Sequence, residues 1–361
     1  MDIYFLGTDG VELQGSALQY LTERPKDKQY LIIEFFDDHS LTRIEQCITI
    51  EQLASLRAGE MTLVLSNTHE AFHSVVRTIY ELVVIKLGIP PAQIILMSES
   101  AIIDQPIRSI AEQFDLPEIH AEWSRIFEFN LTVLLTNDVT TLEDKHYDKK
   151  FINFNRRWRP HRPVFVALLK AHGLLDKGYV SLMSGVDNDT WESTWEATSQ
   201  LEPSLISHKN SILNTPPLCL DTTELNLNQV DLSNSTDSYY SNSYFSIVSE
   251  TYFYDWWGIG LFLSEKTFKP IKKRHPFILL NRPHALEKLR SIGYQSFSDI
   301  IDESYDTEED DMVRMHMVLA ETKRLSSLSG TDLSDFLAKA RVICDHNYNV
   351  LQDKRDFVTR L

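Results

Sequence analysis

Short apolar runs alternate with helical patterns in the first half of the chain. The runs cover residues 3–7, 30–36, 61–66, 94–98 and 129–135. Between the third and fourth runs, apolar residues from Phe72 to Leu87 recur every three or four positions, the period of a helix with one buried face. Gly88 and Pro90 end this helix. Strand, helix and strand joined by short connections predict parallel pairing with a right-handed crossover, and so an α/β fold.

The same pattern returns in the second half of the chain. Residues 137–148 are polar and lack periodicity, which is typical of a linker between domains. Further strands are predicted at residues 151–154, 179–183, 245–248 and 276–280. Residues 187–242 are rich in Ser, Thr and Asn and predict long surface loops. We therefore expect two doubly wound, Rossmann-like α/β domains, over residues 1–140 and 150–328, followed by a helix over 331–361. Ligands of such folds bind at the carboxyl ends of the strands.

The charge of the chain restricts its partners. It has 52 Asp and Glu against 35 Lys and Arg, a formal net charge of −17. A protein this acidic repels polyanions, so tight non-specific binding to DNA or RNA is disfavoured. Positive charge gathers in two clusters: Arg156, Arg157, Arg159, His161 and Arg162, and then Lys266, Lys269, Lys272, Lys273 and Arg274. In an acidic chain, these clusters predict specific binding of a small anion such as a diphosphate.

Other features predict a cytoplasmic protein without a membrane span. No stretch approaches the roughly 18–20 consecutive apolar residues that a spanning helix needs. The first residues run into a strand pattern without the basic segment of a signal peptide. Cys47, Cys219 and Cys344 share no spacing, which suits buried free thiols in a reducing compartment.

The triplet Ser264-Glu265-Lys266 opens a predicted short helix between two buried strands. Helix N-termini attract phosphate through free N–H groups and the helix dipole, and Lys266 adds a positive charge there. Glu265 can accept hydrogen bonds from ribose or sugar hydroxyls. The alternative is an ordinary helix with Ser264 as its N-cap and the lysines in solvent.

Four arginines, Arg156, Arg157, Arg159 and Arg162, follow the first strand of the second half and precede a helix. This is the position of a phosphate-binding loop, and guanidinium groups bind phosphate oxygens bidentately. Because four arginines in seven residues are too many for a buried structural role, we expect at least one to contact a phosphate. The alternative is a solvated loop or ion pairs with the acidic first half.

The order of these motifs resembles the alpha-1,3-fucosyltransferase family and uncharacterised phage and bacterial sugar transferases. The counterparts here are Ser249-Glu250-Thr251, Ser264-Glu265-Lys266 and His275-Pro276-Phe277-Ile278. The resemblance implies that Lys266 contacts the diphosphate of a nucleotide-sugar donor and Glu265 its ribose or sugar. It implies that Glu250 lines the same pocket, to which we add Lys269. The family has Asn where this chain has Thr251, and the Trp256-Trp257 pair is unusual for the family. The resemblance therefore does not identify which nucleotide-sugar is the donor.

Residues 94–100, Ile-Ile-Leu-Met-Ser-Glu-Ser, resemble the family's strand that ends in Glu-Ser. The resemblance implies that Glu99 is the general base that deprotonates the acceptor hydroxyl. Asp9, Asp37 and Asp38 are rival bases on neighbouring strand ends, and a turn or helix cap is the structural alternative for Glu99. We expect Asp9, Asp38, Trp256 and Trp257 on the acceptor side or rim of the site.

These features together predict an inverting glycosyltransferase of GT-B architecture, with its two domains facing a cleft. A nucleotide-sugar would be bound by the second domain and a glycan or other hydroxyl acceptor by the first, with no cofactor and no metal. The last helix is expected to cross back to the first domain, as in that class. One alternative is a phage-type enzyme that glycosylates a hydroxymethylated DNA base. Another is a non-catalytic nucleotide-sugar-binding protein.

Three further motifs are interpreted as structural or accidental. Asp187-Asn188-Asp189 mimics a metal-binding Asp-x-Asp but lies in the loop-rich region, where a turn is expected. The segment from His69 to His73 matches H-E-x-x-H, yet no third zinc ligand follows on a second helix. The acidic run at residues 302–306 predicts either a pocket rim or a solvated turn.

Overall fold

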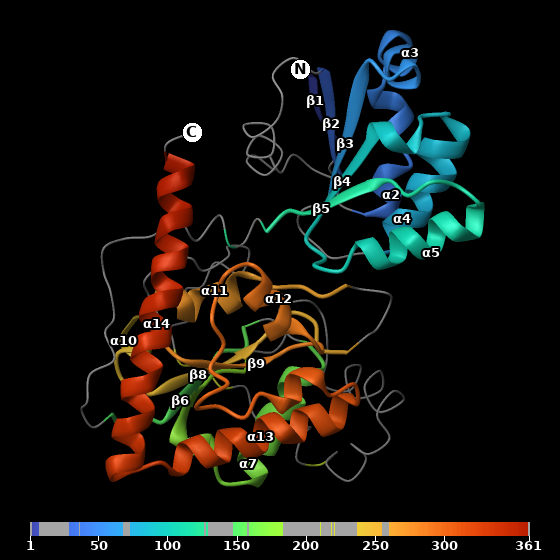
Figure 1. Cartoon of the computed structure of the whole chain (residues 1–361). Coiled ribbons are helices and arrows are strands. Elements are labelled where there is room, and N and C mark those ends of the chain that lie inside the picture. The colour runs from blue at the N-terminus through green and yellow to red at the C-terminus, as the bar shows by residue number, and fades with distance from the viewer. Residues whose placement is uncertain are drawn as a thin grey trace. The chain divides into compact units, whose positions relative to one another are not determined.

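The computed structural model describes residues 2–6, 29–35, 37–67, 73–125, 128, 147–156, 159–182, 210, 218, 220, 237–254 and 260–359. The chain divides into two compact units. Unit 1 contains residues 1–126, 255–262 and 361, and unit 2 contains residues 127–254 and 263–360. Each unit is built on one parallel sheet (Figure 1).

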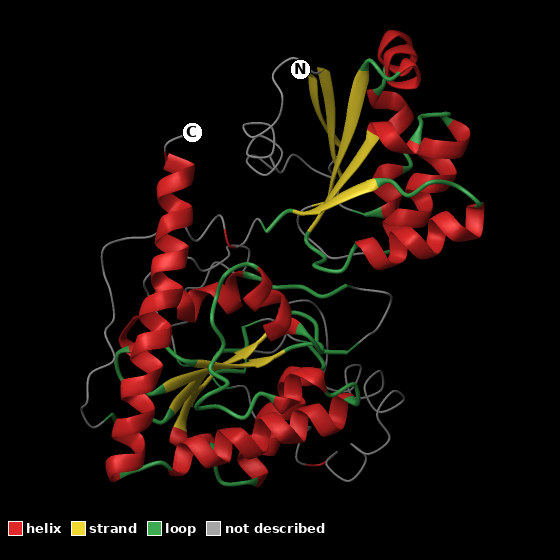
Figure 2. Ribbon diagram, in the orientation of Figure 1, coloured by secondary structure: helices red, strands yellow, loops and turns green. Residues whose placement is uncertain are grey.

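The described strands of unit 1 are β1 (Asp2–Leu6), β2 (Gln29–Phe35), β3 (Met61–Asn67), β4 (Ile94–Ser98) and β5 (His120–Trp123). They pair in parallel in the order of the sequence, β1-β2-β3-β4-β5, so every described crossover advances in one direction. Right-handed crossovers that advance in one direction place their helices on the same face of a sheet. Figure 2 shows the described helices of unit 1 on one face.

These helices are α2 (Asp38–Leu41), α3 (Ile50–Ala58), α4 (Ser74–Thr78), which continues as the π-helix η2 (Ile79–Lys86), and α5 (Asp104–Phe114), with short 3₁₀ turns η1 (Ile44–Cys47) and η3 (Pro91–Gln93). Helix α3 starts with a capping box between Thr49 and Gln52 and ends at Gly59, whose φ of 78° favours glycine. The main core joins alternate strand residues to the helices and includes Leu31, Ile33, Leu63, Leu65, Ile94, Leu56, Ile79 and Ile107. The opposite face buries a smaller cluster of Tyr30, Ile32, Val64 and Met97.

The described strands of unit 2 are β6 (Phe151–Asn153), β7 (Gly178–Val180), β8 (Phe245–Ser249) and β9 (Phe277–Leu280). Their order is β7-β6-β8-β9, and all pairs are parallel. The chain therefore leaves β6 in one direction to reach β7 and later returns to the other side of β6 to form β8. This reversal makes the second sheet doubly wound.

Helices cover both faces of this sheet (Figure 1). They are α7 (His161–Ala171), α10 (Asp237–Tyr240), α11 (Glu265–Lys272), α12 (Ala285–Ser291), α13 (Asp311–Ser327) and α14 (Gly330–Thr359), with 3₁₀ turns η4 (Leu175–Lys177) and η6 (Ser304–Thr307). Helix α13 packs against α7 and β9, while α11 packs against β8 and α14. The predicted return of the last helix to the first domain stays a prediction.

The predicted α/β class, with a parallel sheet in each half, is confirmed. The strand predicted at residues 129–135 and most of the loops predicted at 187–242 lie outside the described residues. Strand β5 was not predicted, because His120–Trp123 contains no apolar run. Among the described residues, no helix has the length and apolar character needed to cross a membrane.

Candidate functional site

The strand order reverses between β6 and β8. Open α/β sheets bind ligands at the carboxyl ends of the strands at such a reversal. Polar residues follow both strands at this edge. Asn155 and Arg156 come after β6, and Glu250 and Thr251 come after β8. The motifs that the sequence singled out in the second half therefore belong to one edge of one sheet.

Two buried asparagines join the strand ends at this edge. The Asn153 side-chain N–H group donates to the Ile247 carbonyl and to the Ser249 hydroxyl, both at 2.9 Å. The Asn155 side chain donates to the Asn153 side-chain oxygen at 2.7 Å and to the Ser181 carbonyl at 3.0 Å. Both asparagines are fully buried. Sequence reasoning missed this network, although Asn-x-Asn at the end of an apolar run was a signal.

The start of α7 is tied to the end of β8. Arg162 is buried, and its Nη2 donates to the Ser249 and Glu250 carbonyls, each at 3.0 Å. His161 Nε2 donates to the same Glu250 carbonyl at 3.0 Å, and its ring stacks on Phe253. Burial and the adjacent Arg162 charge hold the pKa of His161 well below its usual value, so the ring is neutral. The expectation that these arginines are too numerous for a buried structural role is wrong for Arg162.

Glu250 has a fully buried carboxylate that bonds to the start of α11. Oε1 accepts from the Ser264 backbone N–H at 2.9 Å and from the Thr267 hydroxyl at 2.6 Å. Oε2 accepts from the Thr251 backbone N–H at 3.0 Å and from the Ser264 hydroxyl at 2.6 Å. The sequence predicted a phosphate at the N-terminus of α11, and the Glu250 carboxylate already lies there. The N-terminus of a helix stabilises either anion.

Ser264 is the N-cap of α11, as the structural alternative predicted, and accepts from the Lys266 N–H. The Lys266 ammonium donates to Glu265 Oε1 at 2.8 Å, to the Ser264 hydroxyl at 3.0 Å and to the Thr251 hydroxyl at 3.3 Å. Its side chain is 31% exposed. An ammonium has three N–H groups, so a phosphate bound here would replace one of these three hydrogen bonds. Burial raises the pKa of Glu265, but the Lys266 charge and hydrogen bonds outweigh it and leave that pKa below its usual value.

The second basic cluster does not form one anion site. Lys266 and Lys269 are half-buried on α11. Lys273 is buried at the other end of this helix and pairs with Asp237 at 2.6 Å. Arg274 pairs with Asp345 at 3.3 Å and lies over the Tyr348 ring. Lys273 and Arg274 therefore attach α10 and α14 to the rest of unit 2. The prediction that this cluster binds a small anion is wrong for these two residues.

The acidic run at residues 302–306 is mainly structural. Asp306 is buried and accepts from the Leu286 and Glu287 N–H groups at 2.9 and 3.2 Å, which caps α12. Burial raises the pKa of Asp306 despite these hydrogen bonds. Glu303 accepts from the Phe297 N–H at 2.6 Å. Neither side chain is in a solvated turn.

In unit 1, Glu99 directly follows β4 and is fully buried. It accepts a hydrogen bond from the Ser124 hydroxyl. The next residue, Ser100, shares a 2.9 Å hydrogen bond with His73. Gly260 packs on this pair, because an added Cβ would lie 1.8 Å from Ser100 Oγ and 2.3 Å from His73 Nε2. The assignment of Glu99 as general base stays a prediction.

The rival bases Asp37 and Asp38 differ in environment. Asp37 caps α2 by accepting from the Ser40 N–H at 2.8 Å, and this hydrogen bond lowers the pKa of Asp37. Asp38 has one buried carboxylate oxygen without a hydrogen-bond partner in the described part of the chain. It lines a hollow of about 440 Å³ together with His73, Ser74, Arg77, Thr78, Glu81, Pro106, Ser109 and Ile110. Asp38 is therefore the better acceptor-side candidate.

Several predicted residues lie outside the described part of the chain: Asp9, Arg157, Trp256, Trp257, Asp187, Asp189 and His69. Arg156 and Arg159 are described and half-buried beside β6 and α7. Among the described residues, no group of three or more His, Cys, Asp or Glu side chains could hold a metal ion.

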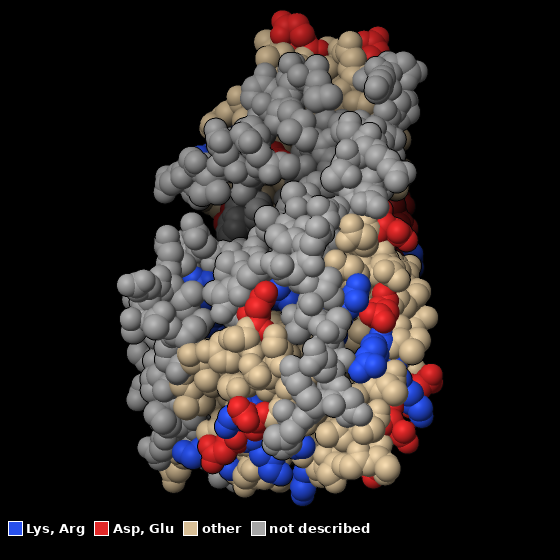
Figure 3. Space-filling view, turned by 90° about the vertical axis from the view of Figure 1, so that its left-hand side faces the viewer, with Lys and Arg blue, Asp and Glu red and all other residues tan. Residues whose placement is uncertain are grey.

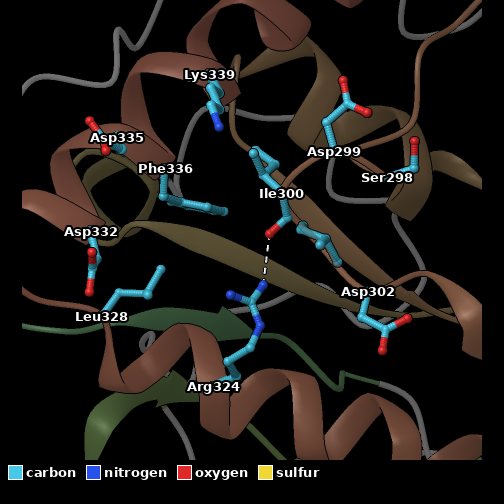
Figure 4. Close-up of a pocket in the computed structure, with 11 residues that line it drawn as sticks. Ser298, Asp299, Ile300, Asp302, Arg324, Leu328, Asp332, Asp335, Phe336 and Lys339 are labelled. Carbon is cyan, nitrogen blue, oxygen red and sulfur yellow. Dashed lines mark hydrogen bonds between the residues drawn. The ribbon is translucent and has the colours of Figure 1, made fainter.

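A larger hollow of about 600 Å³ in unit 2 lies away from these strand ends. It is lined by Ser298, Asp299, Ile300, Ile301, Asp302, Arg324, Leu328, Asp332, Asp335, Phe336 and Lys339 (Figure 4). The Leu328 carbonyl accepts from Lys150, the residue before β6, at 3.4 Å. This hollow is therefore at the amino edge of the sheet, opposite the edge where such folds bind ligands.

No model of a known protein family matches the sequence, and no curated protein sequence matches it. Two similar solved structures are trehalose-6-phosphate synthases. One, studied for enzymatic glycosyl transfer with retention, is 13% identical with a TM-score of 0.45, over 96% of this chain and 77% of that one. The other, from Burkholderia multivorans, is 11% identical with a TM-score of 0.46, over 96% of this chain and 73% of that one. A likeness this distant establishes neither family nor activity.

Proposed function

We propose that this protein is a metal-independent, inverting glycosyltransferase that moves a sugar from a nucleotide-sugar to a hydroxyl acceptor. The observation that carries the proposal is the strand-order reversal between β6 and β8, with Lys266, Arg156 and Arg159 beside it. A crevice at the carboxyl edge of a doubly wound sheet binds nucleotides in many proteins, and cations there suit a diphosphate.

The donor would be held mainly by unit 2. Lys266 and one of Arg156 or Arg159 would contact the diphosphate, and Glu265 would accept from ribose or sugar hydroxyls. When the sugar leaves, negative charge develops on the diphosphate oxygen. Fixed ammonium and guanidinium groups stabilise that charge, which is the work a metal ion does in other transferases.

The acceptor would be activated by unit 1. Glu99 would take the proton of the acceptor hydroxyl while its oxygen bonds to the anomeric carbon. The bond between that carbon and the diphosphate oxygen breaks, and the nucleoside diphosphate departs with the electron pair. Attack from the face opposite the leaving group inverts the configuration. The hollow beside Asp38, with hydroxyl, carboxylate and guanidinium groups, suits the hydroxyls of such an acceptor.

Nothing in the described part of the chain favours the DNA-base alternative. On the face shown in Figure 3, the described Lys and Arg side chains are interspersed with Asp and Glu instead of forming a continuous basic surface. Duplex binding depends on neutralising many phosphates at once, which a mixed surface does poorly.

A thermal-shift screen against nucleoside diphosphates and nucleotide-sugars tests the proposal. A true ligand at a hundred times its Kd adds about 2.7 kcal/mol of stability. Lys266→Ala should reduce the shift by about half or more at the same ligand concentration, whereas Lys339→Ala, an exposed lysine at the amino edge, should retain it. Slow hydrolysis of the donor without acceptor would distinguish an enzyme from a binding protein. If neither a shift nor hydrolysis occurs with any common nucleotide-sugar, the proposal is wrong.

A further inference from the structure

Glu250 differs from Glu265, the other carboxylate that the sequence assigned to the donor site. Its two oxygens accept four hydrogen bonds, all from Thr251, Ser264 and Thr267. An ionised carboxylate offers about four lone-pair positions, so these bonds use its full capacity. The side chain is also fully buried. A donor hydroxyl could reach Glu250 only by breaking one of these bonds.

The groups that Glu250 holds are the groups that orient Lys266. The Lys266 ammonium donates to the Ser264 and Thr251 hydroxyls, at 3.0 and 3.3 Å. The Ser264 hydroxyl in turn donates to Glu250, and so does the Thr251 backbone N–H. The backbone carbonyl of Glu250 also accepts hydrogen bonds from the side chains of His161 and Arg162, at the start of α7. Glu250 is therefore hydrogen-bonded to the starts of both α7 and α11 at this edge of the sheet.

We propose that Glu250 is a positioning residue that acts through Lys266 and does not touch the donor. This inference rests on the proposed function, because it concerns the same diphosphate site. It replaces the expectation, implied by the family resemblance, that Glu250 lines the donor pocket.

The sign of one mutational effect separates positioning from direct contact. Glu250 is an anion near the site proposed for another anion. Removing its charge by itself would strengthen diphosphate binding, because like charges repel. Pyrophosphate has no sugar hydroxyl that Glu250 could hold, so weaker pyrophosphate binding in Glu250→Gln indicates that Lys266 is no longer correctly positioned.

Calorimetry with inorganic pyrophosphate and with UDP, GDP, ADP, CDP and dTDP provides the test. We expect Glu250→Gln to weaken binding of those probes that bind the native protein by about tenfold, the scale of one charge-assisted hydrogen bond. The double variant with Lys266→Ala should bind within about twofold of Lys266→Ala alone, since coupled residues are not additive. If Glu250→Gln does not fold, Thr267→Val can replace it, because this variant removes only one hydrogen bond to Glu250. It should weaken binding of the same probes by a smaller factor.

Glu321→Gln is the matched control. Glu321 is a buried carboxylate of the same unit that accepts from the Asp302 N–H at 3.1 Å and pairs with Arg324 at the amino edge. The Glu321→Gln variant should be less stable than the native protein but should bind the diphosphate probes with native affinity. If Lys266→Ala weakens binding while Glu250→Gln does not, or if the two effects add, the positioning role is overturned and the proposed function stands. If the native protein binds none of the probes, the proposed function fails, and the inference fails with it.

Discussion

The two units contain the same kinds of strands and helices but order their strands differently. In unit 1 the described strands follow the sequence, whereas in unit 2 the order reverses at β6. At the reversal, the chain leaves neighbouring strands toward opposite faces of the sheet, and a crevice opens between them. The described strands of unit 1 contain no such point. Strand order thus explains why the buried polar network and the cations gather at the carboxyl edge of unit 2.

The edges also differ in charge. The described carboxyl edge of unit 1 has Asp38 and Glu99, with Arg77 in the hollow beside Asp38. That of unit 2 has the carboxylates Glu250 and Glu265 together with three cations, Lys266, Arg156 and Arg159. A carboxylate suits a proton acceptor, and fixed cations suit a departing diphosphate. The comparison predicts a division of labour, with proton transfer in unit 1 and donor binding in unit 2. The predictions below test that division.

The largest effect is expected from Glu99→Gln. Removal of a positioned general base costs 10²–10⁴ in rate, roughly 3–5 kcal/mol of transition-state stabilisation. The nucleotide is assigned to unit 2, so its affinity should stay near the native value. Transfer rates with the acceptor, together with calorimetry of the nucleotide, measure the two effects separately.

Glu122→Gln is the control for this variant, because Glu122 is a half-buried carboxylate on the neighbouring strand β5. It should retain transfer. If Glu99→Gln transfers sugar at more than about a tenth of the native rate, above the range for a lost base, Glu99 is structural. Asp38, which has a buried oxygen without a hydrogen-bond partner among the described residues, then becomes the better candidate.

Acid should destabilise unit 2 through its buried histidines. Burial lowers the pKa of His275 to about 4, and that of His161 also lies well below its usual value. The unfolded imidazole binds a proton below about pH 6.5 and the folded one does not, so stability falls as pH drops from about 6.5 to 4. For His275 the loss approaches about 3 kcal/mol.

Denaturant unfolding between pH 7 and pH 4.5 measures this loss. His275→Gln should show a shallower decline than the native protein, because it has one fewer group to protonate on unfolding. His120→Gln, which removes an exposed histidine of unit 1, should leave the decline unchanged. Equal slopes for the native protein and His275→Gln would show that carboxylates alone govern the acid response.

Local features of the fold were predictable from the sequence. Apolar runs located strands β2, β3, β4, β6, β8 and β9, and Ser264 was correctly identified as a potential N-cap. These features depend on neighbouring residues, so a local pattern contains them. Strand β5 was missed because it has only four residues, in which the apolar Ala121 and Trp123 alternate with His120 and Glu122, and none of them is fully buried.

The strand order and the polar network were not predictable in this way. The partners of Arg162 are 87 and 88 positions away in the chain, and those of Asn153 are 94 and 96 positions away. The sequence alone does not distinguish an arginine that is buried from one that binds phosphate at the surface. Only the fold shows which carbonyls are near enough to satisfy the guanidinium group.

Lys266→Ala should have a smaller effect, confined to unit 2. Loss of one charge-assisted contact weakens nucleoside diphosphate binding by roughly 1.5–3 kcal/mol. Calorimetric titration measures the affinity, and Lys339→Ala provides a lysine control from the same unit. Unchanged affinity in Lys266→Ala would remove the start of α11 from the donor site and leave Arg156 and Arg159 as its cations.

The smallest expected effect is that of removing divalent metal, which we expect to change nothing. Lys266 and the arginines beside β6 are available to neutralise the leaving diphosphate, so the chemistry does not require a metal for that purpose. Turnover in excess EDTA should therefore equal turnover in Mg²⁺ or Mn²⁺. A loss of activity that Mn²⁺ restores would assign Asp187 and Asp189 as ligands and move the stabilisation of the leaving group away from unit 2's cations. Stoichiometric zinc would instead point to His69 and His73, although His73 is hydrogen-bonded to Ser100 in unit 1.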